Sequence, residues 1–393
     1  MKSGWQTKTL GDVTEVIAGQ SPEGSFYNTS GDGLPFYQGK KEFGEKFIGP
    51  PTTWTSRTTK IALEGDVLMT VRAPVGPVNF ATEKSCIGRG LAAIRSGNSL
   101  DKDFLFYFLL SKQDEISGTE GAVFASINKA EIEKIRIAVP PLPEQQRIVR
   151  ILDEAFEGIA TATANAEKNL QNARALFESY LEAVFSQRGK GWEEKPLSEL
   201  CDIKHGFAFK SEFFTSEGDF VVLTPGNFYE SGGYRDRDDK QKYYSGKIPP
   251  SFILEKGDLL VAMTEQAAGL LGSPILVPES NKFLHNQRLG LVIKKPGVSW
   301  TNEFFFHIFN TQTVRREIHD SASGGKVRHT SPTKIGDVVV SFPTLVSKQN
   351  AIVSKLADLR EETQRLEFLY QRKLAALEEL KKSLLHQAFN GEL

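Results

Sequence analysis

The stretch EQQRIVRILDEAFEGIATATANAEKNLQNARALFESYLEAVFS, residues 144–186, decides how this chain is organised. It contains no proline and a single glycine, and Pro143 before it suits the first turn of a helix. At about 1.5 Å per residue, a helix of this length extends roughly 65 Å, far more than a globular domain requires. A second stretch of the same length, residues 347–389, contains neither proline nor glycine. We therefore expect two unusually long helices.

The two long segments share a near-heptad pattern of apolar residues. The pattern runs from Ile148 through Leu176 to Val184, and it recurs 204 positions later (352 − 148), from Ile352 through Leu380 to Ala388. If the helices run antiparallel, small side chains of one face large side chains of the other. The expected facing pairs are Ala166 with Tyr370, Ile159 with Leu377, and Ala388 with Ile148. This pattern favours an intramolecular antiparallel coiled coil; the alternative is that each helix binds an external partner.

Everything before each long segment is also repeated. The pair Trp5 and Leu10 recurs as Trp192 and Leu197, an offset of 187 (192 − 5). Later matches lie further apart: the offset is 192 for Gly65 and Gly257, 199 for Arg89 and Arg288, and 204 for Gly121 and Gly325. The second copy is therefore longer by insertions between matched positions. Such insertions belong in surface loops, where recognition residues are common.

Each copy has the pattern of a mixed α+β domain. IALEGDVLMTVRAPVG (residues 61–76) and FILEKGDLLVAMTEQ (residues 252–266) each place a Gly-Asp turn before an apolar run of strand length. Apolar runs at 104–110 and 304–309 indicate buried helices, and IRIAVP and VVVSFP indicate closing strands. The expected division is a first domain at 1–142, a long helix at 143–186, a second domain at 187–345, and a second long helix with the C-terminal end at 346–393.

An antiparallel helix pair would relate the two α+β domains by a pseudo-two-fold axis. Two modules related in this way can present equivalent surfaces to two half-sites of duplex DNA, with the helices setting the spacing. Because the loops of the two copies differ, we expect unequal half-sites and hence an asymmetric, gapped target.

Composition limits the other classes of function. The formal net charge is −1 and the sequence pI is near 6.6, which counts against a simple polycationic nucleic-acid binder. Cys86 and Cys201 lie far apart, so a disulfide framework or a cysteine-rich zinc site is not expected, and both are interpreted as packed thiols. The first ten residues lack an apolar run, and there is no stretch of eighteen apolar residues, so the protein is expected to be cytoplasmic and not membrane-bound.

Several segments resemble one known family. INKAEIEKIRIAVPPLPEQQRIVRILDE (residues 127–154) resembles the junction between target recognition domain and conserved region in the specificity subunits of type I restriction-modification systems. KKSLLHQAFNGEL at 381–393 is similar to the C-terminal end of that family, and GDVLMTVRAPVG and CIGRGLAAI are similar to the core of its recognition domain. The second copy departs from the pattern at PTLVSKQNAIV, residues 343–353, where the PLPEQQ string is degenerate.

The resemblance implies a DNA-recognition subunit without catalytic activity. Such subunits bind two copies of an adenine N6-methyltransferase subunit through the helices, join restriction subunits, and read a bipartite site in double-stranded DNA. S-adenosylmethionine, ATP and Mg²⁺ would then belong to the partner subunits, and the chain itself would hold no cofactor and no metal. The methyltransferase acts on a flipped adenine, because a base inside the duplex is out of reach.

No sequence motif indicates catalysis by this chain. It lacks the phosphate-loop, dinucleotide, zinc-protease and nucleophile-elbow patterns, and an Asn/Asp-Pro-Pro-aromatic methyltransferase motif. All six histidines lie in the second half, so a duplicated histidine site is excluded, and His307, at the place of Tyr107, is interpreted as a packed ring. Two alternatives remain: an autonomous DNA-modifying enzyme, and a coiled-coil scaffold that does not contact DNA.

Candidate DNA-binding residues are Lys, Arg, His or amide side chains in glycine-rich or aromatic stretches between the matched positions. For each of them a solvated surface residue is the alternative. Arg89 and Arg288, at matched positions, are interpreted as positioning residues that bind phosphate or form a structural ion pair, rather than as readers of a base edge. In the first domain the candidates are Gln38, Lys40, Lys41, Lys46, Arg57, Lys60, Arg72 and Arg89. In the second they are Lys204, His205, Lys210, Asn227, Arg235, Arg237, Lys240, Lys242 and Arg288, together with Lys326, Arg328 and His329 of GGKVRH, which replaces the uncharged GAVFAS at 121–126.

Overall fold

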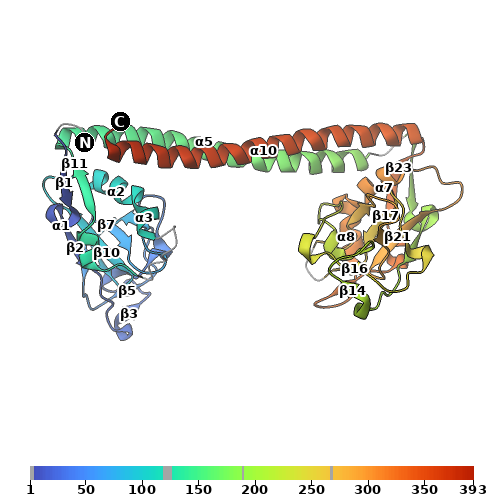
Figure 1. The fold of residues 1–393 in the computed structure, drawn as a ribbon, viewed down its shortest axis with the longest axis horizontal. Coiled ribbons are helices and arrows are strands. Elements are labelled where there is room, and N and C mark those ends of the chain that lie inside the picture. The colour runs from blue at the N-terminus through green and yellow to red at the C-terminus, as the bar shows by residue number, and fades with distance from the viewer. Residues whose placement is uncertain (1–3, 118–125, 188–189, 266–268) are drawn as a thin grey trace. The chain divides into compact units, whose positions relative to one another are not determined.

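The computed structural model describes residues 4–117, 126–187, 190–265 and 269–393 (Figure 1). It consists of two compact units. Unit 1 comprises residues 1–167 and 371–393, and unit 2 comprises residues 168–370. Each unit contains one sheet-rich domain and one segment of each long helix, α5 (Leu142–Phe185) and α10 (Val346–Asn390). The expected long helices are confirmed to within two residues at each end.

The domain of unit 1 is built on a four-stranded antiparallel sheet. Its strand order is β2 (Thr14–Ala18), β10 (Leu91–Ser96), β7 (Val67–Thr70) and β8 (Val78–Phe80). A second sheet, here called the smaller sheet because its strands are shorter, has five strands. Their order is β3 (Tyr27–Asn28), β5 (Trp54–Thr55), β4 (Leu34–Tyr37), β9 (Ser85–Ile87) and β6 (Ile61–Ala62). β1 (Gln6–Thr9) pairs with β11 (Arg136–Val139), which leads directly into α5. The helices of this domain are α1 (Leu10–Val13), α2 (Lys102–Ser111), α3 (Gln113–Ser117) and α4 (Lys129–Glu133).

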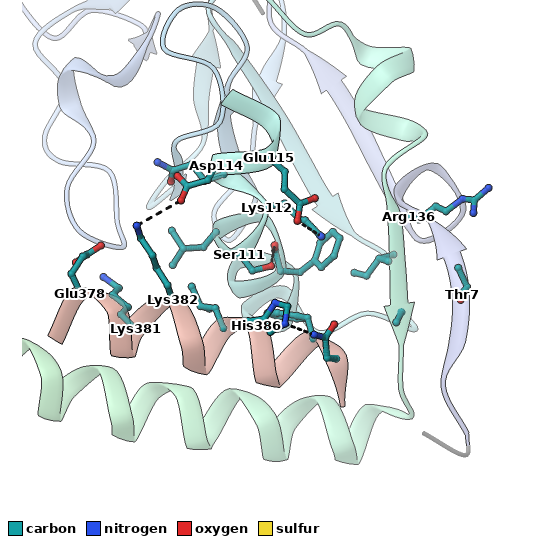
Figure 2. A pocket seen from close by; sticks show the side chains of 18 residues that line it. Thr7, Ser111, Lys112, Asp114, Glu115, Arg136, Glu378, Lys381, Lys382 and His386 are labelled. Carbon is teal, nitrogen blue, oxygen red and sulfur yellow. Dashed lines mark hydrogen bonds and ion pairs between the residues drawn. The ribbon is translucent and has the colours of Figure 1, made fainter. Parts of the chain in front are cut away.

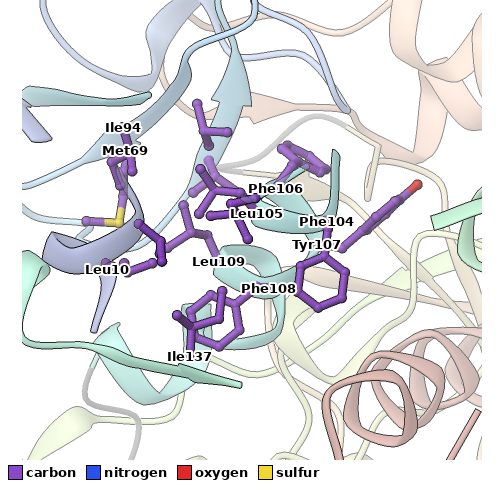
Figure 3. Packing of buried hydrophobic residues seen from close by; sticks show 14 of the residues in the cluster. Leu10, Met69, Ile94, Phe104, Leu105, Phe106, Tyr107, Phe108, Leu109 and Ile137 are labelled. Atoms are coloured by element: carbon purple, nitrogen blue, oxygen red, sulfur yellow. The ribbon is translucent and has the colours of Figure 1, made fainter. Parts of the chain in front are cut away.

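The core of unit 1 forms between the four-stranded sheet and α2 (Figure 3). Helix α2 is apolar on nearly all sides, and every residue from Phe104 to Leu109 is buried, as expected for this run. Phe104 and Phe108 also contact Phe389 of α10, with ring centroids 5.1 and 5.5 Å apart. The domain and its helix segments therefore share one core.

Unit 2 repeats this plan. Its main sheet has the order β13 (Cys201–His205), β21 (Leu289–Lys294), β17 (Leu259–Ala262) and β19 (Pro274–Leu276). The smaller sheet is β14 (Phe214–Thr215), β16 (Tyr243–Tyr244), β15 (Val221–Val222) and β20 (Phe283–Leu284). Two further pairs are β12 (Trp192–Pro196) with β23 (Val339–Pro343), and β18 (Thr264–Glu265) with β22 (Arg328–His329). The helices are α6 (Leu197–Leu200), α7 (Asn302–Phe309), α8 (Gln312–Asp320) and α9 (Pro332–Gly336). The α+β fold class expected for both copies is confirmed.

A buried glutamine ties each domain to its long helix. In unit 1 the Gln145 side chain accepts a hydrogen bond from the Asp101 amide (2.7 Å) and donates to the carbonyls of Ser99 (3.0 Å) and Pro140 (2.8 Å). Asp101 in turn caps the start of α2, because its side chain accepts hydrogen bonds from the amides of Asp103 and Phe104. The glutamine therefore couples the helix cap of the domain to the first turns of α5.

Gln349 repeats this arrangement in unit 2. It accepts from the Thr301 amide (3.1 Å) and donates to the carbonyls of Ser299 and Pro343 (3.0 Å each). Thr301 caps α7 as Asp101 caps α2. The second junction lacks most of the PLPEQQ string. Gln349 nevertheless keeps the position of Gln145 and its hydrogen bonds to the domain and to the strand before the helix.

Within each unit the two helix segments run antiparallel, as predicted. In unit 1 Ile148 and Ala388 lie in the same buried cluster, and Lys381 lies 5.2 Å from the ring of Phe156. In unit 2 Arg174 pairs with Glu367 at 3.0 Å, and the cations of Arg360 and Lys355 lie over the rings of Phe177 and Tyr180 at 5.1 and 5.2 Å.

The predicted seam is wrong at four positions, where Asn169, Leu176, Lys373 and Leu380 are exposed. The predicted positions Val184 and Ala388, nearer the C-terminal ends, are buried, so the pattern fails locally. At its C-terminal end α5 also packs against the α+β domain of unit 2, where the ring centroids of Phe185 and Phe304 lie 5.2 Å apart.

Candidate nucleic-acid interface

Four segments of unit 1 meet at one end of its main sheet. They are the residues after β2, the residues after β4, the residues after β7, and the turn Gly88–Gly90 between β9 and β10, here called turn 88–90. Backbone hydrogen bonds hold them together: Gln20 donates to Ile87 (2.9 Å), Gly88 to Tyr37 (2.8 Å), and Val71 to Gly90 (2.9 Å). The exposed side chains of these segments therefore share one surface.

Unit 2 builds the same end, and two of these three hydrogen bonds recur there. The turn Asn286–Arg288, here called turn 286–288, lies between β20 and β21. Phe207 donates to His285 (2.8 Å) as Gln20 donates to Ile87, and Met263 donates to Arg288 (3.0 Å) as Val71 donates to Gly90. The two turns are therefore equivalent in backbone and in their place in the sheet.

This equivalence corrects one predicted match. In unit 1 Ala92 pairs with Ala18, and in unit 2 Gly290 pairs with His205, so the offset between the turns is 198 (290 − 92) and not 199. Arg89 therefore corresponds to Gln287, and Arg288 to Gly90. The interpretation of the two arginines as a shared phosphate contact loses its basis, because they do not occupy equivalent positions.

The two turns present different side chains. In turn 88–90 a Cβ atom on Gly90 would collide with the carbonyl oxygen of Gln38, and one on Gly88 would lie 3.0 Å from the Gln38 Cγ atom. Only Arg89 therefore extends from this turn, and it is exposed. In turn 286–288 Asn286 is 7% exposed and accepts a hydrogen bond from the Arg288 amide at 3.0 Å, while Gln287 and Arg288 are exposed.

The segment before the last small helix of each domain reaches the same end. Arg72 forms a β-bridge with Ser126, and Thr264 pairs with His329 in the same way. His329 therefore occupies the place of Ser126, as the sequence match predicts. In the comparison of GAVFAS (residues 121–126) with GGKVRH (residues 324–329), residues 121–125 lie outside the residues that the structure describes.

Most candidates of the first domain lie at or near this end. Arg72 and Arg89 are exposed on it, and Gln38 packs on turn 88–90 with its amide nitrogen 3.4 Å from the Ser21 hydroxyl. Lys60 is adjacent, since its carbonyl accepts a hydrogen bond from Ile87. The remaining exposed candidates are Lys40 and Lys41 on the short helical turn after Gly39, and Arg57, which lies 5.2 Å from the ring of Phe26.

Lys46 lies elsewhere and has another role. Its ammonium group is 2.9 Å from the Asp153 carboxylate on α5, 3.2 Å from Asp103, and 5.1 Å from the ring of Tyr107. Tyr107 also donates a hydrogen bond to Asp153. These contacts join the first domain to its helix, which argues against a DNA contact for Lys46.

In the second domain, His205 and Arg288 are exposed at the equivalent end, and His329 lies beside them. Lys204 donates to the carbonyl of Ser251 and lies 4.9 Å from the ring of Phe252. The other placed candidates are Lys326 in the exposed loop before β22, Lys210 near Glu212, and Arg235, Arg237, Lys240 and Lys242 in the insertion between β15 and β16.

Two candidates of the second domain are already engaged within it. Asn227 is 1% exposed, and its amide bonds Thr224, Arg235 and Gln241, so it is unavailable for a base contact. The guanidinium of Arg328 bonds the carbonyl of His319 at 2.6 Å. Both residues shape the loops that carry the exposed side chains.

Sequence reasoning missed Ser21 and Gln287. Ser21 accepts hydrogen bonds from the Arg89 amide (3.2 Å) and the Gln38 side chain, so it organises turn 88–90. Gln287 was passed over because the match at offset 199 put Arg288 in the position of interest. An alignment of the two copies with an offset of 198 at this turn would have matched Gln287 with Arg89.

Buried side chains of unit 2 have shifted pKa values. Burial lowers the pKa values of His285 and His307 to about 4 and raises that of Cys201 to about 12. Both cysteines are free and buried, as expected for packed thiols. Among the described residues there is no group of three or more His, Cys, Asp or Glu side chains that could hold a metal ion. In the same residues no helix is long and apolar enough to span a membrane.

A surface cavity of about 650 Å³ lies in unit 1 between α2, α3, β11 and the end of α10 (Figure 2). Its rim carries charges of both signs, including Lys382 and Asp114, which lie 4.0 Å apart. The corresponding cavity in unit 2, between α5, α7, α8 and β23, is only about 130 Å³. None of the predicted DNA-binding residues lines either cavity.

The fold and the two turns define a class: a modular binding protein with two related α+β domains, unequal exposed side chains at equivalent places, and long helices joined to both domains. Comparison with known proteins is more specific. The family model described as the type I restriction modification DNA specificity domain matches the chain twice, at residues 2–171 and 189–376. The chain therefore belongs to the family of type I restriction-modification specificity subunits, which are non-catalytic components of these systems.

Two relatives come from Methanocaldococcus jannaschii. The putative type I restriction enzyme MjaX specificity subunit is 40% identical over 174 residues, which is 43% of this chain and 40% of that protein. The type I restriction enzyme MjaVIII specificity subunit is 22% identical over 99% of this chain and 93% of its own length. The long match therefore extends over both domains and both helices.

Two solved structures share the fold at 18% sequence identity. One is a chain from a structure titled for complex assembly and conformational transition of the type I R-M system, with a TM-score of 0.80 over 100% of this chain and 99% of that chain. The other is the HsdS subunit from Thermoanaerobacter tengcongensis, with a TM-score of 0.64 over 100% and 98%.

Proposed function

We propose that this chain reads an asymmetric, bipartite, gapped site in double-stranded DNA, each α+β domain contacting one half-site. The observation that carries this proposal is the pair of equivalent turns. Several of the hydrogen bonds that hold their backbones recur, but the exposed side chains are Arg89 in one and Gln287 with Arg288 in the other. Two domains whose turns have equivalent backbones but different exposed side chains suit two half-sites of different sequence.

Partner subunits follow from the same proposal. The relatives are named specificity subunits of type I restriction enzymes, and we propose that this chain likewise docks two methyltransferase subunits, and restriction subunits, through its long helices. Large apolar side chains are exposed for such docking: Leu176, Leu369 and Leu380 on α5 and α10 are between 47% and 51% exposed. A net charge of −1 also favours a partner that supplies part of the positive charge needed at the phosphates.

The chemistry is assigned to those partners. S-adenosylmethionine would be held by the methyltransferase subunits and ATP with Mg²⁺ by the restriction subunits. This chain would select the adenine to be flipped and methylated without holding a cofactor. Because the substrate is the DNA of the cell, the proposal implies a cytoplasmic location.

Footprinting the chain assembled with its methyltransferase subunit tests the proposal. We expect two protected blocks of defined sequence separated by an unspecified spacer. Exchange of residues 191–342 for the equivalent segment of a relative should change one block only. Protection without two sequence-specific blocks would instead support a scaffold that does not read DNA, and methylation by the purified chain alone would support an autonomous enzyme.

A further inference from the structure

We propose that turns 88–90 and 286–288 are base-reading elements, with Arg89 contacting bases of one half-site and Gln287 and Arg288 contacting bases of the other. This inference rests on the proposed function and assigns it to particular residues. It follows from the hydrogen-bond register of the two sheets, which places Gln287 where Arg89 lies.

The backbone of each turn is rigidly held from several sides. Leu91 donates to Gly88 and Leu289 to Asn286, both at 3.0 Å, which closes the two turns in the same way. The flanking strands β10 and β21 are central in their sheets, each with a neighbour on both sides. A side chain on such a support keeps its position when a ligand binds, as base readout requires.

In turn 88–90 one side chain is available for contact. Gly88 and Gly90 are closed off by Gln38, so the guanidinium of Arg89 extends alone from the surface. In the described part of the chain this guanidinium makes no hydrogen bond or ion pair. Arginine that is free in this way can donate two hydrogen bonds to O6 and N7 of a guanine in the major groove.

In turn 286–288 two side chains are available. Asn286 is used inside the turn, where it accepts the Arg288 amide, and this leaves the amide of Gln287 and the guanidinium of Arg288 facing solvent. Neither group bonds another described side chain. Glutamine can pair with N6 and N7 of adenine, and arginine with guanine, so this turn would read two bases.

The replacement of Arg89 by Gln287 argues against a shared phosphate clamp. A cationic phosphate contact draws its strength from charge and contributes equally in every sequence. A neutral carboxamide at the equivalent place loses the charge but keeps a paired donor and acceptor. That exchange is the one expected if the turns select different bases.

The test uses the chain assembled with its methyltransferase subunits and DNA libraries in which one half-site at a time is randomised. Arg89→Gln and Gln287→Arg exchange the two side chains, and Gln287→Asn keeps the amide on a shorter stem. Lys84→Ala and Lys294→Ala are matched controls, because both residues are exposed near the same strands but away from the turns. Unfolding of each variant is measured in parallel.

Arg89→Gln should change the base preference about tenfold or more at one position of one half-site, and Gln287→Arg should do so in the other half-site only. Gln287→Asn should relax that position without changing the other half-site, and the controls should match the wild type. Uniform weakening on all sequences would overturn the proposal, because it indicates phosphate binding. Unchanged preference with intact folding would overturn it as well. Failure of the proposed function is seen separately, as a wild-type complex that protects no pair of sequence-specific blocks.

Discussion

Replacement of Gln145 by leucine tests whether one side chain couples the first domain to its helix. The side chain is 0% exposed and makes three hydrogen bonds, to the Asp101 amide and to the carbonyls of Ser99 and Pro140. Leucine has a similar volume but neither donor nor acceptor. It would leave the Asp101 amide and the buried Pro140 carbonyl without partners, while the carbonyl of the exposed Ser99 can turn to water.

Each of these two unsatisfied buried groups costs about 1–3 kcal/mol, so Gln145→Leu should lower the free energy of unfolding of unit 1 by about 2–6 kcal/mol. Denaturant unfolding measures this loss, and hydrogen exchange at the Asp101 amide reports the broken bond directly. Gln146→Leu is the control, because Gln146 is exposed on the next position of the same helix. Equal stability of the two variants would refute the argument. Gln349→Leu should have the same effect in unit 2, and the two losses should add because the sites share no partner.

Three further changes test other contacts. Lys46→Met removes the ion pairs with Asp153 and Asp103 and should cost unit 1 about 1 kcal/mol in thermal or denaturant unfolding, while leaving the salt dependence of DNA binding unchanged. His307→Phe should make unit 2 less acid-sensitive. The folded-state pKa of about 4 lies below the ordinary 6.5, so the unfolded state takes up the proton first, and stability falls as the pH drops from about 6.5 to 4, by about 1.4 kcal/mol per pH unit. Unfolding curves at pH 7 and pH 5 that shift equally in wild type and variant would contradict this. Glu265→Ala should destabilise unit 2 by about 3 kcal/mol in denaturant unfolding, because this buried carboxylate accepts three backbone hydrogen bonds at 3.0–3.1 Å, and Glu265→Gln should lose less.

The long helices and one strand of each main sheet could be predicted from the sequence because they rest on local apolar patterns. Apolar spacing over many turns identifies α5 and α10, and a Gly-Asp turn before an apolar run identifies β7 and β17. Both signals are local and repeat in the second copy. The smaller sheets were not predicted, since strands as short as Tyr27–Asn28 and Val221–Val222 carry no periodic pattern of their own.

The candidate site was predicted only in outline, because the properties that decide it are not local. Lys46 and Asn227 have the residue types of a DNA contact. Lys46, however, is paired with two carboxylates, and Asn227 is buried within the segment between β15 and β16. Sequence alone cannot distinguish these from exposed residues such as Arg89. The predicted seam of the helices also failed at Leu176, which is 48% exposed.

The register of the two turns connects the repeat to specificity. A repeat with identical side chains at the turns would favour a palindromic site, whereas a repeat with unrelated backbones would give no reason to expect two half-sites of similar size. Here the hydrogen bonds that close each turn and tie it to its neighbours largely recur, and Arg89 is replaced by Gln287 and Gly90 by Arg288. A change at these positions can therefore alter which bases are read without altering where the turn lies. If the proposal holds, new specificities can arise in one domain at a time while the helices and both Gln145 and Gln349 junctions stay as they are.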